Sequence, residues 1–117
     1  MTEAVQTFFA AWSIADADAR RDMIAGAIAD TVSYADPRTA TPLTELNAVN
    51  DYVGMFAQAA PGATASVIKS DTQAGVTRAT VAFAMADGMV QHGQYFVEYD
   101  GDKISRMVGF VGTGTPE

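Results

Sequence analysis

The prevailing spacing of the apolar residues of this chain changes near residue 62, and this change limits the folds open to it. Before that point they recur at every third or fourth position, as in amphipathic helices; the first segment shows this in Val5, Phe8, Phe9 and Trp12. After it, apolar and polar residues alternate in segments rich in Val, Thr, Ile and aromatics, as in strands. Helices followed by strands predict an α+β fold, with the helices on one face of a curved antiparallel sheet.

The expected elements fill the chain. Its 117 residues fit a single domain over residues 1–117. Helices are expected within residues 2–14, 15–30 and 44–59, with a short strand at 31–36 before the third. Longer strands are expected within 63–70, 75–86, 89–99 and 103–112. Asp-Gly pairs precede the last two strands and favour hairpins between neighbours.

The composition of the chain limits the kinds of molecule that the protein is expected to bind. Acidic residues outnumber basic ones 14 to 7, giving a net charge of −7 that opposes binding to nucleic acid or to an anionic membrane surface. There is no cysteine, which excludes disulfides, a thiolate nucleophile and cysteine-bound metal. The sequence shows neither a signal peptide nor a membrane-spanning segment. We expect a cytoplasmic protein whose partner is a small apolar molecule or a second copy of itself.

The segment VSYADP, residues 32–37, carries the first candidate for chemistry. Alternation along the strand places Val32, Tyr34 and Asp36 on one side, which should face the helices. An aspartate before a proline often only starts a turn by bonding its own backbone. A carboxylate aimed into an apolar interior is instead a candidate general base, able to remove a proton next to a carbonyl or from a hydroxyl. Both interpretations of Asp36 are open at this point.

The strand at 89–99 is apolar on both of its faces. An antiparallel sheet with one face in water should be polar on that face. We therefore expect the face away from the helices to pair with a second protomer as a homodimer. Isolated surface hydrophobic residues are the simpler alternative.

The order of these elements resembles the nuclear transport factor 2-like superfamily, which includes ketosteroid isomerases and SnoaL-like polyketide cyclases. The segments that carry the resemblance are VSYADP, AVNDYVGMF and GQYFVEYDGDKISRMVGF. It implies a cone-shaped, cystatin-like α+β barrel, with three N-terminal helices on the concave face of the sheet. It also implies that Asp36 matches the general base of ketosteroid isomerases. The two oxyanion donors of that family fall on Phe8, which has no hydroxyl, and on Gln94, which is not an acid.

Other side chains are candidates for binding a ligand. His92, Gln94 and Phe96 alternate on the face expected to line the cone, where a neutral imidazole and an amide suit a carbonyl oxygen. A lone histidine is, however, more often a structural residue. The expected pocket wall or core comprises Trp12, Tyr34, Phe56, Phe83 and Phe110. No spacing suits a metal site or a cofactor, so none is expected. Arg106 points either inward, toward an acid or a substrate anion, or into solvent.

Two functions remain open from sequence. One is an isomerase, cyclase or dehydratase that acts on a small apolar carbonyl compound, with Asp36 moving the proton. The other is a non-catalytic module of the same fold that binds a small ligand or forms dimers. Retention of Asp36 favours the first, and the residues at positions 8 and 94 favour the second.

Overall fold

A computed structural model of the chain describes residues 2–112 and shows the helices in the first half. α1 spans Thr2–Ala10 and continues into a short 3₁₀ turn, η1, at Ala11–Ser13; α2 spans Ala17–Ala27 and α3 spans Leu46–Ala59. α2 begins where the side chain of Asp16 accepts a hydrogen bond from the backbone N–H of Ala19 at 2.9 Å, a typical N-cap. α3 ends just before the Pro-Gly pair at 61–62.

Five strands form one sheet in the order β1-β5-β4-β3-β2. They are β1 (Ile28–Ala35), β2 (Thr64–Gln73), β3 (Val76–Ala84), β4 (Val90–Asp100) and β5 (Lys103–Val111). β2 to β5 form the expected antiparallel meander. β1 pairs with β5 in parallel, so the sheet is mixed and the prediction of an antiparallel sheet is wrong for this strand. A parallel pair needs a long connection, which α3 and the meander supply here.

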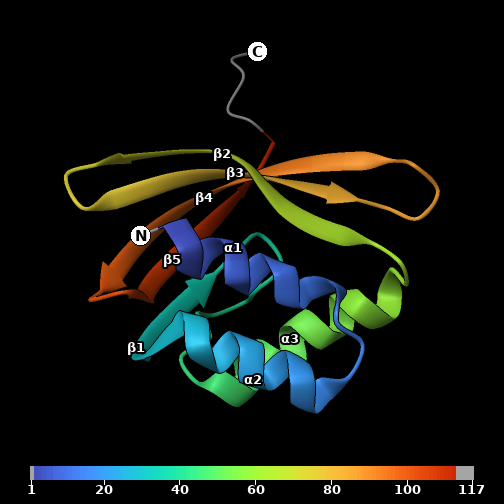
Figure 1. Ribbon diagram of the computed structural model, residues 1–117, viewed down its shortest axis with the longest axis horizontal. Coiled ribbons are helices and arrows are strands. Elements are labelled where there is room, and N and C mark those ends of the chain that lie inside the picture. The colour runs from blue at the N-terminus through green and yellow to red at the C-terminus, as the bar shows by residue number, and fades with distance from the viewer. Residues whose placement is uncertain (1, 113–117) are drawn as a thin grey trace.

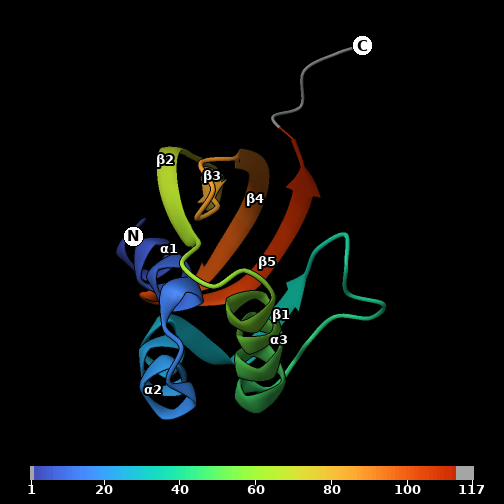
Figure 2. The same ribbon diagram turned by 90° about the vertical axis from the view of Figure 1, so that its right-hand side faces the viewer.

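The sheet is strongly curved, and the three helices lie on its concave side (Figures 1 and 2). α1 packs against α2 and β2, while α2 packs against α3. The strands curl around the helices without closing into a barrel, because β1 and β2 remain separate edges. Within residues 2–112, no helix is long and apolar enough to cross a membrane.

The concave face of β4 carries Gly93, Tyr95 and Val97, all buried. The alternating residues His92, Gln94 and Phe96 therefore lie on the convex face, and the prediction that they line the interior is wrong. Phe110, opposite Gln94 on β5, is also on the convex face and 55% exposed, so its expected place in the core or pocket wall is wrong as well. The large ring of Tyr95 fills the interior and determines which face is buried.

The convex face is apolar at its centre and charged around it. Phe96 and Phe110 form an edge-to-face pair with ring centroids 5.7 Å apart. Arg106 points outward and bonds Glu98 at 3.3 Å, which answers the question of its direction. This surface, on β3, β4 and β5, is hereafter the convex face.

Two close approaches hold the helices and strands in place. Arg20 of α2 is buried, and its side chain donates to Asn50 Oδ1 and to the carbonyl of Ile14 at 2.9 and 3.0 Å. Gly54 of α3 lies so close that a Cβ there would sit 2.5 Å from Arg20 Nη2. On the sheet, a Cβ at Gly109 would meet the ring of Tyr95, with Cδ2 at 2.9 Å and Cζ at 3.0 Å. Since buried rings cannot move aside without disturbing their neighbours, position 109 requires glycine.

Gly109→Ala is expected to destabilise the fold by about 1–3 kcal/mol, because it overpacks the Tyr95 ring. Gly26→Ala is the matched control, since nothing lies within 4 Å of a Cβ on this exposed helical glycine. It should stabilise by a few tenths of a kcal/mol to about 1 kcal/mol. Urea denaturation followed by circular dichroism measures both. Equal stability of the two variants would contradict the packing described for Tyr95.

Candidate functional site

Asp36 follows the last residue of β1, and its carboxylate is the centre of a small hydrogen-bond network. Oδ2 accepts from the hydroxyl of Tyr34 at 2.7 Å and from the hydroxyl of Tyr52 at 2.5 Å. Oδ1 accepts from the backbone N–H of Arg38 at 2.9 Å. The turn interpretation is confirmed, because Oδ1 accepts the Arg38 N–H in the turn after β1. Oδ2 meets two phenols on the helix side of the sheet, and a role as general base stays a prediction.

The local chain path explains why these groups meet. Tyr34 and Leu43 exchange backbone hydrogen bonds of 2.9 and 2.8 Å, which closes the loop from Asp36 to Pro42. That closure leads the chain directly into α3, where Tyr52 faces back toward β1. Asp36 itself is only half-buried, so the network lies at the edge of the core rather than at its centre.

The phenols around Asp36 remain protonated over the physiological pH range. Burial raises the pKa of Tyr34 well above its usual value, and the nearby Tyr95 and the Asp36 carboxylate raise it further. Burial and then the hydrogen bond to Asp36 raise the pKa of Tyr52. Burial raises the pKa of Tyr95 to about 12. Tyr34 and Tyr52 are therefore neutral donors, which suits them to hold a carboxylate.

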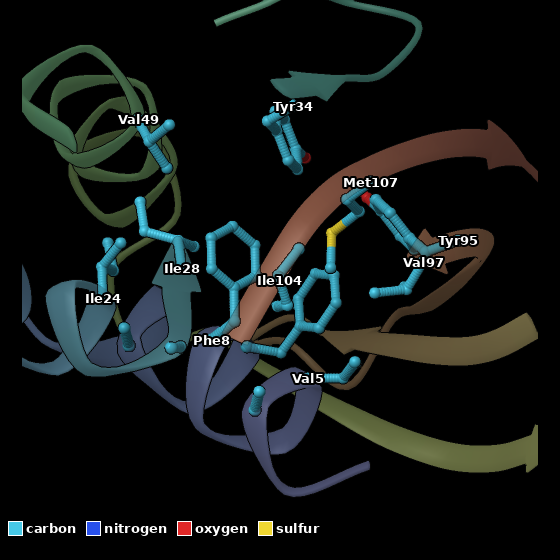
Figure 3. Packing of buried hydrophobic residues seen from close by; sticks show 14 of the residues in the cluster. Val5, Phe8, Ile24, Ile28, Tyr34, Val49, Tyr95, Val97, Ile104 and Met107 are labelled. Carbon is cyan, nitrogen blue, oxygen red and sulfur yellow. The ribbon is translucent and has the colours of Figure 1, made fainter. Parts of the chain in front are cut away.

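Behind Asp36 the interior is filled by rings from α1, η1, β1, α3, β3 and β4. Neighbouring rings have centroids 4.8 to 6.5 Å apart. Figure 3 shows Tyr34 from β1 and Tyr95 from β4 entering the same core as Phe8 of α1. We call this set the aromatic cluster: Phe8, Phe9, Trp12, Tyr34, Tyr52, Phe56, Phe83 and Tyr95.

The aromatic cluster has a buried side and a half-buried rim. Tyr52, Phe56 and Phe83 form the rim, and Trp12 lies beneath them at 4% exposure. The indole N–H of Trp12 is buried without a hydrogen-bond partner. An unpaired buried donor of this kind costs about 1–3 kcal/mol.

Several predicted site residues meet here and several do not. Trp12, Tyr34, Phe56 and Phe83 lie in the aromatic cluster that adjoins Asp36. His92, Gln94, Phe96 and Phe110 are on the convex face, on the other side of the sheet. Phe8, at one oxyanion position implied by the resemblance, is a buried hydrocarbon ring.

Sequence reasoning missed Tyr52 and Tyr95 as site residues. Tyr52 shares the apolar stripe of α3 with Phe56, so its pattern alone indicated only core packing. Its hydroxyl acquires a role through the contact with Asp36, which is 16 residues away in the sequence. Tyr95 was missed because the sequence does not show which face of β4 is buried.

On its inner side, Asp36 adjoins the rings of Tyr34 and Tyr52. A groove of about 400 Å³ lies elsewhere, between α2, β1 and the start of α3, where Arg21, Asp30, Glu45 and Lys103 line it. A ligand at Asp36 must therefore part the rim residues. Among residues 2–112, no cluster of three or more His, Cys, Asp or Glu side chains could hold a metal ion.

The similarity of this chain to known proteins is found among solved structures. No protein-family model matches the chain. No curated protein sequence matches it either. Among solved structures, a SnoaL-like family protein from Agrobacterium tumefaciens is similar over 94% of this chain and 95% of its own, with 25% identity and a TM-score of 0.82.

Two more distant structures share the fold. A protein with a ketosteroid isomerase-like fold from Catenulispora acidiphila, solved in complex with trimethylamine, is 10% identical with a TM-score of 0.76; the match covers 94% of this chain and 85% of that one. An NTF2-like protein from Cytophaga hutchinsonii is 8% identical with a TM-score of 0.67, over 94% and 88% of the two chains. The curved sheet, the three helices on its concave side and these neighbours together identify the chain as having the fold of the nuclear transport factor 2-like superfamily.

Proposed function

We propose that this protein binds a small, mainly apolar carbonyl compound beside Asp36 and that Asp36 accepts a proton from it. The observation that carries the proposal is the convergence of two phenol hydroxyls on Oδ2 of one half-buried carboxylate. The adjoining aromatic cluster supplies apolar surface for the body of the ligand. Similarity at 25% identity to a SnoaL-like family protein that is named as an isomerase supports a reaction of the isomerase type.

The hydrogen bonds assign a role to each phenol. Tyr34 is fully buried and stays on Oδ2, where it fixes the direction of the carboxylate. Tyr52 is half-buried, so its hydroxyl is the one that can turn from Oδ2 to a ligand. That turn frees a lone pair of Oδ2 to receive the proton, and it places an O–H donor near the ligand oxygen.

The proposed proton transfer needs no oxidant or reductant. A C–H bond next to the carbonyl breaks, its proton passes to Oδ2, and the electron pair moves onto the carbonyl oxygen as an enolate. In a β,γ-unsaturated ketone, return of the proton to the γ carbon moves the C=C bond into conjugation and completes an isomerisation. Cyclisation and dehydration can begin from the same enolate, so the site supports all three reaction types.

Non-catalytic binding is the second candidate function. Two features favour it: the rings leave little room for a substrate, and both oxygens of Asp36 already accept hydrogen bonds. In that case Asp36 is a structural acceptor that ties β1 to α3, and the aromatic cluster alone holds the ligand.

Asp36→Asn should abolish proton removal while changing ligand affinity only a few-fold. The probe is cyclohexanone in D₂O, whose exchange of hydrogens next to the carbonyl is followed by NMR. We expect the wild type to accelerate exchange above buffer and the variant to lose about 100-fold or more. Asp51→Asn, which changes an exposed acid on α3, is the matched control and should exchange like the wild type.

Binding is measured in parallel by fluorescence of the single tryptophan, Trp12. A wild type that binds cyclohexanone without accelerating exchange supports the non-catalytic function. Exchange that survives Asp36→Asn would exclude this residue as the base.

We also propose that two copies pair through the convex face. Phe96 and Phe110 lie at its centre, where they are 38% and 55% exposed. Two ion pairs flank them, Arg106 with Glu98 and Arg78 with Asp71 at 2.9 Å. The opposite charges within each pair cancel, so the pairs add no net charge beside the two rings of a chain of net charge −7 and reduce the repulsion of a second copy there.

Phe110→Asp should convert a dimer to a monomer, because it places a carboxylate in the centre of the proposed contact. Sedimentation velocity over a range of protein concentrations measures the change. Met55→Asp is the control: Met55 is 66% exposed on α3, away from the convex face, and the variant should sediment like the wild type. A monomeric wild type at all concentrations would contradict the pairing.

A further inference from the structure

The indole N–H of Trp12 is a buried donor that the fold leaves without an acceptor. Trp12 lies in η1 at 4% exposure, and its Nε1 atom has no hydrogen-bond partner among the described residues. Buried polar groups are nearly always paired, and an exception requires an explanation. An unpaired donor beside a candidate site marks a position where a ligand atom can supply the missing acceptor.

Trp12 is separated from the Asp36 carboxylate by a single ring. Its ring centroid lies 6.2 Å from that of Tyr52, whose hydroxyl donates to Asp36 Oδ2. On other sides it meets Phe56 at 5.1 Å and Phe83 at 5.6 Å. Tyr52, Phe56 and Phe83 are the half-buried rim, so a ligand that parts them reaches the indole and the carboxylate together.

We propose that Trp12 Nε1 donates a hydrogen bond to the carbonyl oxygen of the ligand bound at Asp36. This inference rests on the proposed function and names the group that orients the ligand within it. With the oxygen on Trp12, the carbon next to the carbonyl faces Tyr52 and Asp36. When its proton passes to Asp36, negative charge develops on the oxygen, and the indole N–H stabilises that charge.

The surroundings of the indole select the type of acceptor. An indole nitrogen only donates, so its partner must be an acceptor. The groups packed on it are the uncharged rings of the aromatic cluster. A carboxylate or phosphate there would lose its hydration without gaining a counterion. A neutral oxygen, such as that of a ketone, meets the donor at a lower desolvation cost.

The competing explanation is structural. An indole N–H can point at the face of a neighbouring ring, and Phe56 lies edge-to-face with Trp12 at an interplanar angle of 63°. In that case the donor is weakly satisfied within the protein, and a ligand oxygen leaves it unchanged.

The chain has one tryptophan, so its ¹H–¹⁵N spectrum contains one indole cross-peak. The probes are cyclohexanone and methylenecyclohexane, which share a shape and differ in the carbonyl oxygen. Saturation with cyclohexanone should move the indole proton downfield, while methylenecyclohexane should not. Trp12→Phe keeps a ring and removes the donor. It should weaken cyclohexanone binding about three- to tenfold, to the level of methylenecyclohexane, as measured by isothermal titration calorimetry, which needs no tryptophan.

Each outcome decides between the alternatives. An indole peak that stays in place at saturating cyclohexanone, or a Trp12→Phe variant with unchanged preference for the ketone, overturns the inference. Absence of any cyclohexanone binding by the wild type overturns it as well. The shift should persist in Asp36→Asn, because it reports binding rather than proton transfer. A persistent shift without exchange activity in the wild type would contradict the catalytic function alone.

Discussion

The hydrogen bonds from two phenols to one carboxylate oxygen of Asp36 hold the candidate site together. They join the end of β1 to the middle of α3, two elements that the loop between them connects. Bonds to an ionised acceptor are roughly twice as strong as bonds between neutral groups, so this contact fixes geometry as well as adding stability. In the pairing of β1 with β5, Tyr34 lies opposite Met107, and both side chains are buried on the concave side of the sheet.

The same rings that stabilise the fold surround the site. Tyr34 packs on Phe8 and on Tyr95, and Tyr95 in turn depends on the absence of a side chain at Gly109. A ligand that enters beside Asp36 therefore has to part side chains that also form the core. Moving the half-buried rim rings costs the least free energy, because these rings bury less apolar surface on folding than the fully buried rings do. Binding and core packing are coupled through these rings.

Sequence predicted the order of elements and the inward side of Asp36, because both depend on local spacing. The period of the apolar residues marked the three helices and the four long strands, and alternation placed Tyr34 and Asp36 together. It did not determine the buried face of β4, since both faces carry apolar residues. Gly93, which is buried, has no side chain to mark its face, while Phe96 marks the opposite one.

The parallel pairing of β1 and the role of Tyr52 lay beyond local patterns. Both depend on contacts between residues far apart in the chain: Tyr34 with Met107, and Tyr52 with Asp36. A stripe of apolar residues shows which side of a helix is buried, but it does not show what an individual hydroxyl meets. The resemblance to a family implied oxyanion donors at positions 8 and 94, where this chain has Phe8 and Gln94. The hydroxyls that meet Asp36 come instead from Tyr34 and Tyr52.

A crystal structure of the protein grown with cyclohexanone tests the central claim most directly. The predicted result is ligand density between Asp36 Oδ2 and Trp12 Nε1, with the Tyr52 hydroxyl turned from the carboxylate and the rim rings parted. Closed rings around an unchanged Asp36, with cyclohexanone found only in the groove beside α2, would contradict it.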